Sequence, residues 1–216
     1  MIRAGILDWN GACLNDLPVV YKSVKQIFEE FGLKPPTLQE YRTGITYNFS
    51  DFYYSHGVPK SASREDLNKI RQRVLEDYWR RVELQKGARR LVNLCIRHEI
   101  KLALISGEGP IILARRQIQF EKFFAKFDHV EGGAVSKQRP ISRFLRRHGI
   151  KPDEAFIVDD GPGNIITAKK LGLITFGLTS GYSPTSVMQA ARPTFVVKTF
   201  YEIIEELEKL LKQKPN

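Results

Sequence analysis

Polar residues follow three short apolar runs of the sequence, each at the point where the run ends. They are Asp8, Ser106-Gly107 and Asp159-Asp160, with Lys137 between the second and third groups. Carboxylate oxygens are hard ligands that suit Mg²⁺, and an ammonium, a hydroxyl and backbone N–H groups are donors that suit a phosphate. If these groups meet, they predict a site for a divalent cation beside a phosphorylated small molecule.

These groups meet only if the apolar runs are parallel strands of one sheet. Runs of about four to six apolar residues, bounded by Gly, Asp or Ser, are typical of buried parallel strands. We find them at residues 4–8, 101–105, 155–158, 173–176 and 194–197, and we expect residues 129–130 to begin a further, shorter strand. Ligands of open α/β sheets bind beyond the carboxyl ends of the strands, which is where the polar groups lie.

Helical patterns separate the strands, and two of them stop at a glycine. They cover residues 88–98, 108–127, 141–148, 165–171 and 199–212. Gly149 and Gly172 occupy the position after a helix end that favours glycine. Alternating strands and helices predict an α/β fold, with a Rossmann-like parallel sheet flanked by helices.

One long segment interrupts this alternation. Residues 16–85 contain no convincing strand but show helical patterns at 20–31, 37–42, 48–54 and 64–84. We therefore expect two domains: an α/β core from residues 1–15 and 86–216, and an inserted all-helical cap from residues 16–85.

The composition is that of an ordinary globular protein. The 216 residues are 42% hydrophobic and 27% charged, which excludes disordered and collagen-like classes. No apolar run reaches about 18 residues, and the first residues lack the apolar stretch of a signal peptide, so we expect a cytoplasmic protein without a membrane partner. Cys13 and Cys95 form no metal-binding or redox motif, and we interpret them as buried reduced thiols.

The net charge of +10 favours an acidic partner. We expect this partner to be a small phosphorylated molecule and not a nucleic acid, because no nucleic-acid-binding motif is present. The arginine pairs, such as Arg115-Arg116, are spread along helical patterns and predict solvated helix faces. The sequence assigns no oligomeric state.

Four segments, in chain order, together resemble the motifs of a known family. They are residues 7–12 (LDWNGA), residues 104–107 (LISG), Lys137, and residues 158–165 (VDDGPGNI) followed by 168–172 (AKKLG). In this pattern the chain resembles the haloacid dehalogenase-like (HAD) hydrolases with a helical cap, of the phosphoglycolate phosphatase-like kind. The resemblance spans nearly the whole chain, and the Asp-Asp-x-x-x-Asn block is its most specific part.

The resemblance implies Mg²⁺-dependent hydrolysis of a small phosphomonoester. Asp8 would be the catalytic nucleophile that forms an aspartyl-phosphate. The carboxylates of Asp8 and Asp160 and the main-chain oxygen of Asn10 would hold Mg²⁺, with support from Asp159.

The same resemblance assigns the phosphate-binding groups. Ser106 and the N–H of Gly107 would bind phosphoryl oxygens, and Lys137 would offset charge on both the nucleophile and the phosphoryl group. Asn164 would orient its neighbours. The cap would contribute substrate contacts, for which Arg42, Tyr47 and Tyr54 are the candidates. Positioning and charge neutralisation are the main requirements of phosphoryl transfer.

Two positions depart from the family pattern. Asn10 replaces the Asp that serves as general acid and base in the family's phosphatases, and Ala12 replaces a Thr. Losing general acid–base help typically costs about 10²–10⁴ in rate. The chain is therefore either a slow or specialised phosphatase, or a catalytically impaired protein that binds a phosphorylated ligand in a regulatory role.

Two further alternatives rank lower. The Asp8-Trp9 pair also resembles phosphonate hydrolases, which need a cap lysine, but residues 41–49 contain none. Dehalogenases also lack the second Asp, but nothing else in the sequence indicates a haloacid pocket.

Overall fold

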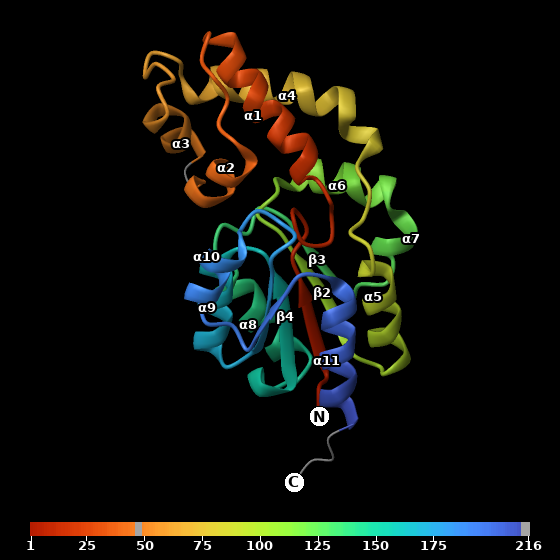
Figure 1. Cartoon of the computed structure of the whole chain (residues 1–216). Coiled ribbons are helices and arrows are strands. Elements are labelled where there is room, and N and C mark those ends of the chain that lie inside the picture. Colours follow the sequence, from red (N-terminus) through yellow and green to blue (C-terminus); the bar gives the residue numbers. More distant parts are fainter. Residues whose placement is uncertain (46–48, 213–216) are drawn as a thin grey trace. The chain divides into compact units, whose positions relative to one another are not determined.

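The central strands form at short apolar runs of the sequence that are buried on both faces of the sheet. The computed structural model describes residues 1–45 and 49–212 (Figure 1). Its six strands are β1 (Ala4–Leu7), β2 (Lys101–Ile105), β3 (His129–Glu131), β4 (Ala155–Asp159), β5 (Ile174–Leu178) and β6 (Phe195–Val197). All residues of β1 and β4 are buried, whereas β3 at one edge of the sheet is only partly buried.

The strands form one parallel sheet in the order β3-β2-β1-β4-β5-β6. The central strand β1 pairs with β2 on one side and with β4 on the other. Leu7, the last residue of β1, is in register with Leu104 and Val158. The residues that follow these three strands therefore lie at one edge of the sheet, and the predicted α/β, Rossmann-like fold is confirmed.

Helices cover both faces of this sheet (Figure 1). They are α5 (Ala88–Arg97), α6 (Pro110–Gln119), α7 (Glu121–Phe124), α8 (Gln138–Arg147), α9 (Pro162–Leu171), α10 (Thr185–Ala190) and α11 (Phe200–Lys212), with the short 3₁₀ helix η2 at Pro152–Glu154. Ile6 and Ile157 point to the face where Phe144 of α8 and Ile165 of α9 pack. Helices α5 and α11 pack against each other, and α5 contacts β2.

The chain divides into two compact units, one formed by Met1–Leu14 with Leu84–Asn216 and the other by Asn15–Glu83. The second unit contains α1 (Leu17–Glu30), α2 (Leu38–Gly44), α3 (Phe49–Ser55), α4 (Arg64–Tyr78) and the 3₁₀ helix η1 (Trp79–Arg81). Helices α1 and α4 pack against each other. The ring of Phe28 on α1 contacts those of Phe52 and Tyr53 on α3. Outside residues 46–48, no strand forms in this unit.

The structure corrects three details of the sequence predictions. The helix predicted over residues 64–84 ends earlier, because Glu83 accepts a backbone hydrogen bond from Asn15 and Gln85 donates one to Cys13. Helix α10 was not predicted. Arg116, expected on a solvated face, is fully buried and folds along its own helix to donate to Gln119.

The prediction for the two cysteines is confirmed, because Cys13 and Cys95 are both buried and free. None of the helices in residues 1–45 and 49–212 is long and apolar enough to cross a membrane.

Candidate functional site

Three carboxylates meet at the carboxyl ends of β1 and β4. Asp8 follows β1, Asp159 ends β4 and Asp160 follows it. All three are buried, and each offers one oxygen that lies within 4.8 Å of the others. This arrangement follows from the register, because Leu7 and Val158 are paired and so bring their successors together. Closely spaced hard oxygen ligands fit the requirements of Mg²⁺.

Lys137 lies among these carboxylates. It immediately precedes α8 and is 2% exposed. Its Nζ donates to Asp8 Oδ1 and, over 2.6 Å, to Asp159 Oδ2. One buried ammonium therefore faces two carboxylates, with the third, Asp160, beside them. The cluster holds more negative than positive charge, which favours a further cation.

Burial and the neighbouring charges together shift the pKa values of the cluster. Burial raises the pKa of Asp8 to about 7, against the opposing charge of Lys137 and with the help of the charge on Asp159. Burial by itself would lower the pKa of Lys137, but the two carboxylates outweigh it and raise that pKa. Lys137 therefore stays positively charged, and a second cation near Asp8 would favour its carboxylate form.

Two glycines make room for the Asp160 carboxylate. A Cβ atom at Gly11 would lie 2.2 Å from Asp160 Oδ2, and one at Gly181 would lie 2.1 Å from the same atom. Gly11 also has a φ of +71°, which other residues rarely adopt. The N–H of Tyr182 donates to Asp160 Oδ2 over 2.6 Å. The sequence reasoning missed Gly181 and Tyr182, although their position just after β5 was a usable signal.

Asn164 acts on Asp159. Its Nδ2 donates to Asp159 Oδ1 over 3.1 Å, and the N–H of Gly161 donates to the same oxygen over 2.7 Å. The other oxygen of Asp159 receives Lys137. Asp159 is thus held from both sides, and Asn164 lies where it orients a member of the acid cluster.

The end of β2 supplies the uncharged polar groups. Ser106 is buried, and its Oγ donates to Asn10 Oδ1 over 3.3 Å. Gly107 is exposed at this edge. Asn10 Nδ2 donates in turn to Glu108 Oε1 over 3.4 Å. Sequence reasoning missed Glu108, although it lies two residues beyond Ser106 at a strand end.

Trp9, between Asp8 and Asn10, is a packing residue. It is fully buried, and its ring contacts those of Phe120 and Phe124, with centroids 5.6 and 4.8 Å away. These contacts fix the loop after β1 against the α6–α7 segment. They position Asp8 and Asn10 without bringing the indole to solvent.

The candidate substrate contacts in residues 16–85 belong to the other unit. Tyr54 donates its hydroxyl to the backbone oxygen of Ala62 within that unit. Arg42 lies in the last turn of α2. Tyr47 and the first residue of the helix predicted at 48–54 lie outside the described residues.

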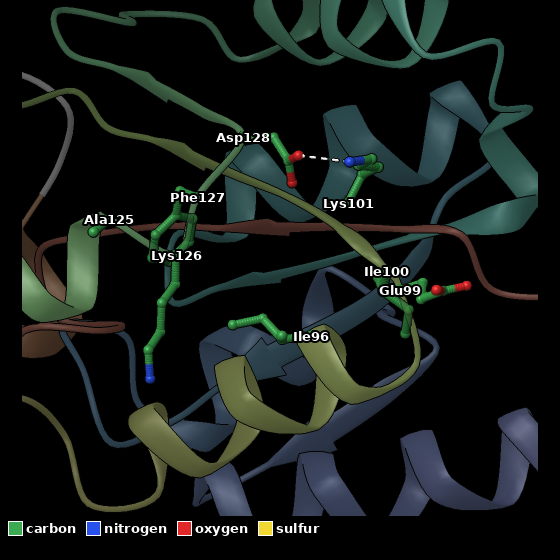
Figure 2. Close-up of a pocket in the computed structure, with 8 residues that line it drawn as sticks. All are labelled: Ile96, Glu99, Ile100, Lys101, Ala125, Lys126, Phe127 and Asp128. Atoms are coloured by element: carbon green, nitrogen blue, oxygen red, sulfur yellow. Dashed lines mark hydrogen bonds and ion pairs between the residues drawn. The ribbon is translucent and has the colours of Figure 1, made fainter.

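A groove of about 650 Å³ lies at the opposite end of β2 (Figure 2). It is lined by Ile96, Glu99, Ile100, Lys101, Ala125, Lys126, Phe127 and Asp128. Lys101 and Asp128 pair with each other over 2.8 Å. Since Lys101 begins β2 and Ser106 follows its end, this groove is separate from the acid cluster.

Comparisons with known proteins agree with the sequence motifs. The profile of the haloacid dehalogenase-like hydrolases matches residues 6–178. A phosphoglycolate phosphatase from Synechococcus elongatus is 22% identical, over 98% of this chain and 100% of its own. Another, from Vibrio parahaemolyticus, is 23% identical, over 94% and 95%.

Solved structures show the same fold. A haloacid dehalogenase-like hydrolase from Streptococcus pneumoniae has a TM-score of 0.77 at 16% identity, with 95% of this chain and 98% of that chain covered. A haloacid dehalogenase-like protein of unknown function from Agrobacterium tumefaciens has a TM-score of 0.78 at 15% identity, with coverage of 98% and 100%. The resemblance stated from the motifs is confirmed.

Proposed function

Because the chain belongs to the haloacid dehalogenase-like hydrolase family, we propose that it is a Mg²⁺-dependent hydrolase of small phosphomonoesters. The observation that carries this proposal is the buried cluster of three carboxylates around Lys137. The names of its phosphoglycolate phosphatase relatives support a phosphatase-type reaction. Binding of a small phosphorylated substrate is consistent with the net charge of +10.

In this proposal Asp8 attacks phosphorus through a carboxylate oxygen. The bond from phosphorus to the ester oxygen breaks, the leaving alkoxide takes a proton from water, and an aspartyl-phosphate remains until water hydrolyses it. Asp8, Asp160 and the main-chain oxygen of Asn10 would hold Mg²⁺, which supplies charge neutralisation for the phosphoryl group. Asp159, fixed by Asn164 and Gly161, supports this set by holding Lys137.

Three groups in this proposal bind the phosphoryl oxygens. The Ser106 hydroxyl and the N–H of Gly107, an exposed residue, would donate from the end of β2, and Lys137 would donate from the start of α8. We assign the helical unit Asn15–Glu83 the role of a cap that contributes to substrate choice. Arg42 and Tyr54 are its candidate contacts.

The test is release of inorganic phosphate from a panel of small phosphomonoesters with Mg²⁺. We expect the wild type to turn over at least one of these esters and to lose this activity when the metal is chelated. Asp8→Asn should reduce turnover at least about 10³-fold, because the covalent route is lost. Asp128→Asn is the matched control. It makes the same change at the groove of Figure 2 and should keep activity within about twofold. Turnover no higher than that of Asp8→Asn would overturn the proposal.

Asn10 favours one alternative function. Its side-chain amide is hydrogen-bonded to Ser106 and Glu108, and an amide supplies no proton to a leaving alcohol near neutral pH. A protein that binds a phosphorylated ligand in a regulatory role, without turnover, fits this feature. Asn10→Asp separates the two functions: a gain of about 10²–10⁴ in phosphate release would show that only proton transfer had been lost.

A further inference from the structure

Glu108 lies at the proposed phosphate site without a role in the proposed reaction. Its backbone N–H donates to Ser106 Oγ over 3.0 Å, and its Oε1 accepts from Asn10 Nδ2 over 3.4 Å. The residue is partly buried and precedes α6 by two positions. The first contact fixes the backbone of Glu108 beside Ser106, and the second places its carboxylate next to the Asn10 side chain.

The positive and negative side chains of the site lie on different sides of it. Lys137 is engaged by Asp8 and Asp159, on the nucleophile side of the cluster. Glu108 places a negative charge beside Asn10, the residue that replaces the family's acid for the leaving alcohol. In the proposed reaction, the part of the substrate nearest Glu108 is therefore the leaving group.

We propose that Glu108 determines the substrate class: it disfavours phosphomonoesters whose leaving group carries an anion near the ester oxygen and favours neutral or cationic leaving groups. This inference rests on the proposed function, which places the leaving group beside Asn10. A like charge close to the leaving group in a partly buried site weakens binding of the ester by on the order of tenfold to a hundredfold. An ammonium on the leaving group would instead be attracted.

This proposal separates the chain from the relatives it resembles. The relatives are named phosphoglycolate phosphatases, and phosphoglycolate carries a carboxylate one carbon away from its ester oxygen. That carboxylate would face Glu108. We therefore expect the chain to use phosphoglycolate poorly compared with esters of the same size that lack the negative charge.

Three esters of similar length and different charge test the proposal. They are 2-phosphoglycolate, 2-hydroxyethyl phosphate and phosphoethanolamine, which carry an anionic, a neutral and a cationic group on the leaving alcohol. The wild type should show the lowest kcat/KM for 2-phosphoglycolate, by about tenfold or more. Glu108→Gln should reduce this gap to less than about threefold, and Glu108→Lys should reverse the order.

A control variant removes the same charge elsewhere. Glu205→Gln lies on the exposed face of α11 and should leave the ranking of the three esters unchanged. Two results would overturn the role of Glu108. One is equal or better use of 2-phosphoglycolate by the wild type, and the other is a ranking that does not change in Glu108→Gln.

Binding measurements keep this test separate from the test of hydrolysis. Calorimetric titration of the three esters into Asp8→Asn, with Mg²⁺ and with or without Glu108→Gln, reports the charge preference without turnover. If binding shows the charge preference but the wild type releases no phosphate, the proposed hydrolysis is overturned and the role of Glu108 is kept. Phosphate release without any charge preference would do the reverse.

Discussion

Lysine–aspartate pairs occur at both ends of the parallel sheet, and they differ in burial. At the carboxyl end, Lys137 contacts Asp8 and Asp159, and the side chains of these three residues are 2%, 10% and 1% exposed. At the amino end, Lys101 contacts Asp128 in the groove of Figure 2, with exposures of 49% and 29%. The same residue types therefore pair in two different environments, one buried and one exposed to water.

The pKa values show what this difference does. Burial raises the pKa of Asp8 to about 7, even with Lys137 beside it. At Asp128 burial also acts to raise the pKa, but it is weaker, and the hydrogen bonds from Lys101 and Leu102 lower the pKa overall. A solvent-exposed ion pair stabilises only a local contact. A buried cluster with more carboxylates than cations has a net negative charge that a bound cation can neutralise.

Removing the two lysines should give the largest contrast. Lys137→Met leaves Asp8 and Asp159 buried without their cation, which should lower the free energy of unfolding by about 3–5 kcal/mol. Lys101→Met makes the same change at an exposed pair and should cost no more than about 1 kcal/mol. Urea unfolding of both variants in EDTA measures the difference. Equal losses of stability would contradict the assignment of Lys137 to a buried charge cluster.

Substituting a glycine beside Asp160 should have the next largest effect, which is a loss of Mg²⁺ affinity at the carboxyl end of the sheet. Gly181→Ala places a Cβ atom 2.1 Å from Asp160 Oδ2 and 2.5 Å from the Gly11 oxygen, so the carboxylate must move. We expect Mg²⁺ affinity to fall by about 10- to 100-fold, as it does when groups that orient metal ligands are lost. Calorimetric titration with Mg²⁺ measures this affinity.

Gly163→Ala is the control for this substitution. Apart from its chain neighbours and the backbone of its own helix, no atom of the described residues lies within 4 Å of a Cβ built at Gly163, in the first turn of α9. Mg²⁺ affinity should therefore stay unchanged. If both variants bound Mg²⁺ as tightly as the wild type, Asp160 would not be a metal ligand held by its glycine neighbours.

The exposed pair should show the smallest effect, and it should depend on pH. The lowered pKa of Asp128 means that its ionised form stabilises the fold above the ordinary value of 3.8, and that this contribution disappears as pH falls through the lowered pKa. Asp128→Asn should therefore cost less than about 1 kcal/mol at pH 7 and almost nothing at about pH 2. Unfolding curves at both pH values check this, and a cost that grew toward low pH would have the wrong sign.

The sequence by itself determined the sheet and most of the acid cluster. Short apolar runs specify buried strands, and parallel strands bring their carboxyl ends to one edge, so Asp8, Asp159 and Asp160 were predictable as neighbours. Lys137 followed from its motif. The sheet and the three aspartates depend on local periodicity and on one rule of topology, which a single chain displays directly, whereas the choice of Lys137 depended on the family resemblance.

Only the tertiary structure decided which loops meet within that edge. Glu108 reaches Asn10 across 98 positions, and Gly181 makes room for Asp160 from the loop after a different strand. Arg116 is buried although its neighbours in sequence predict a solvated face. Such contacts depend on the distances and directions between side chains of separate elements, and residue type and spacing along the chain do not encode them locally.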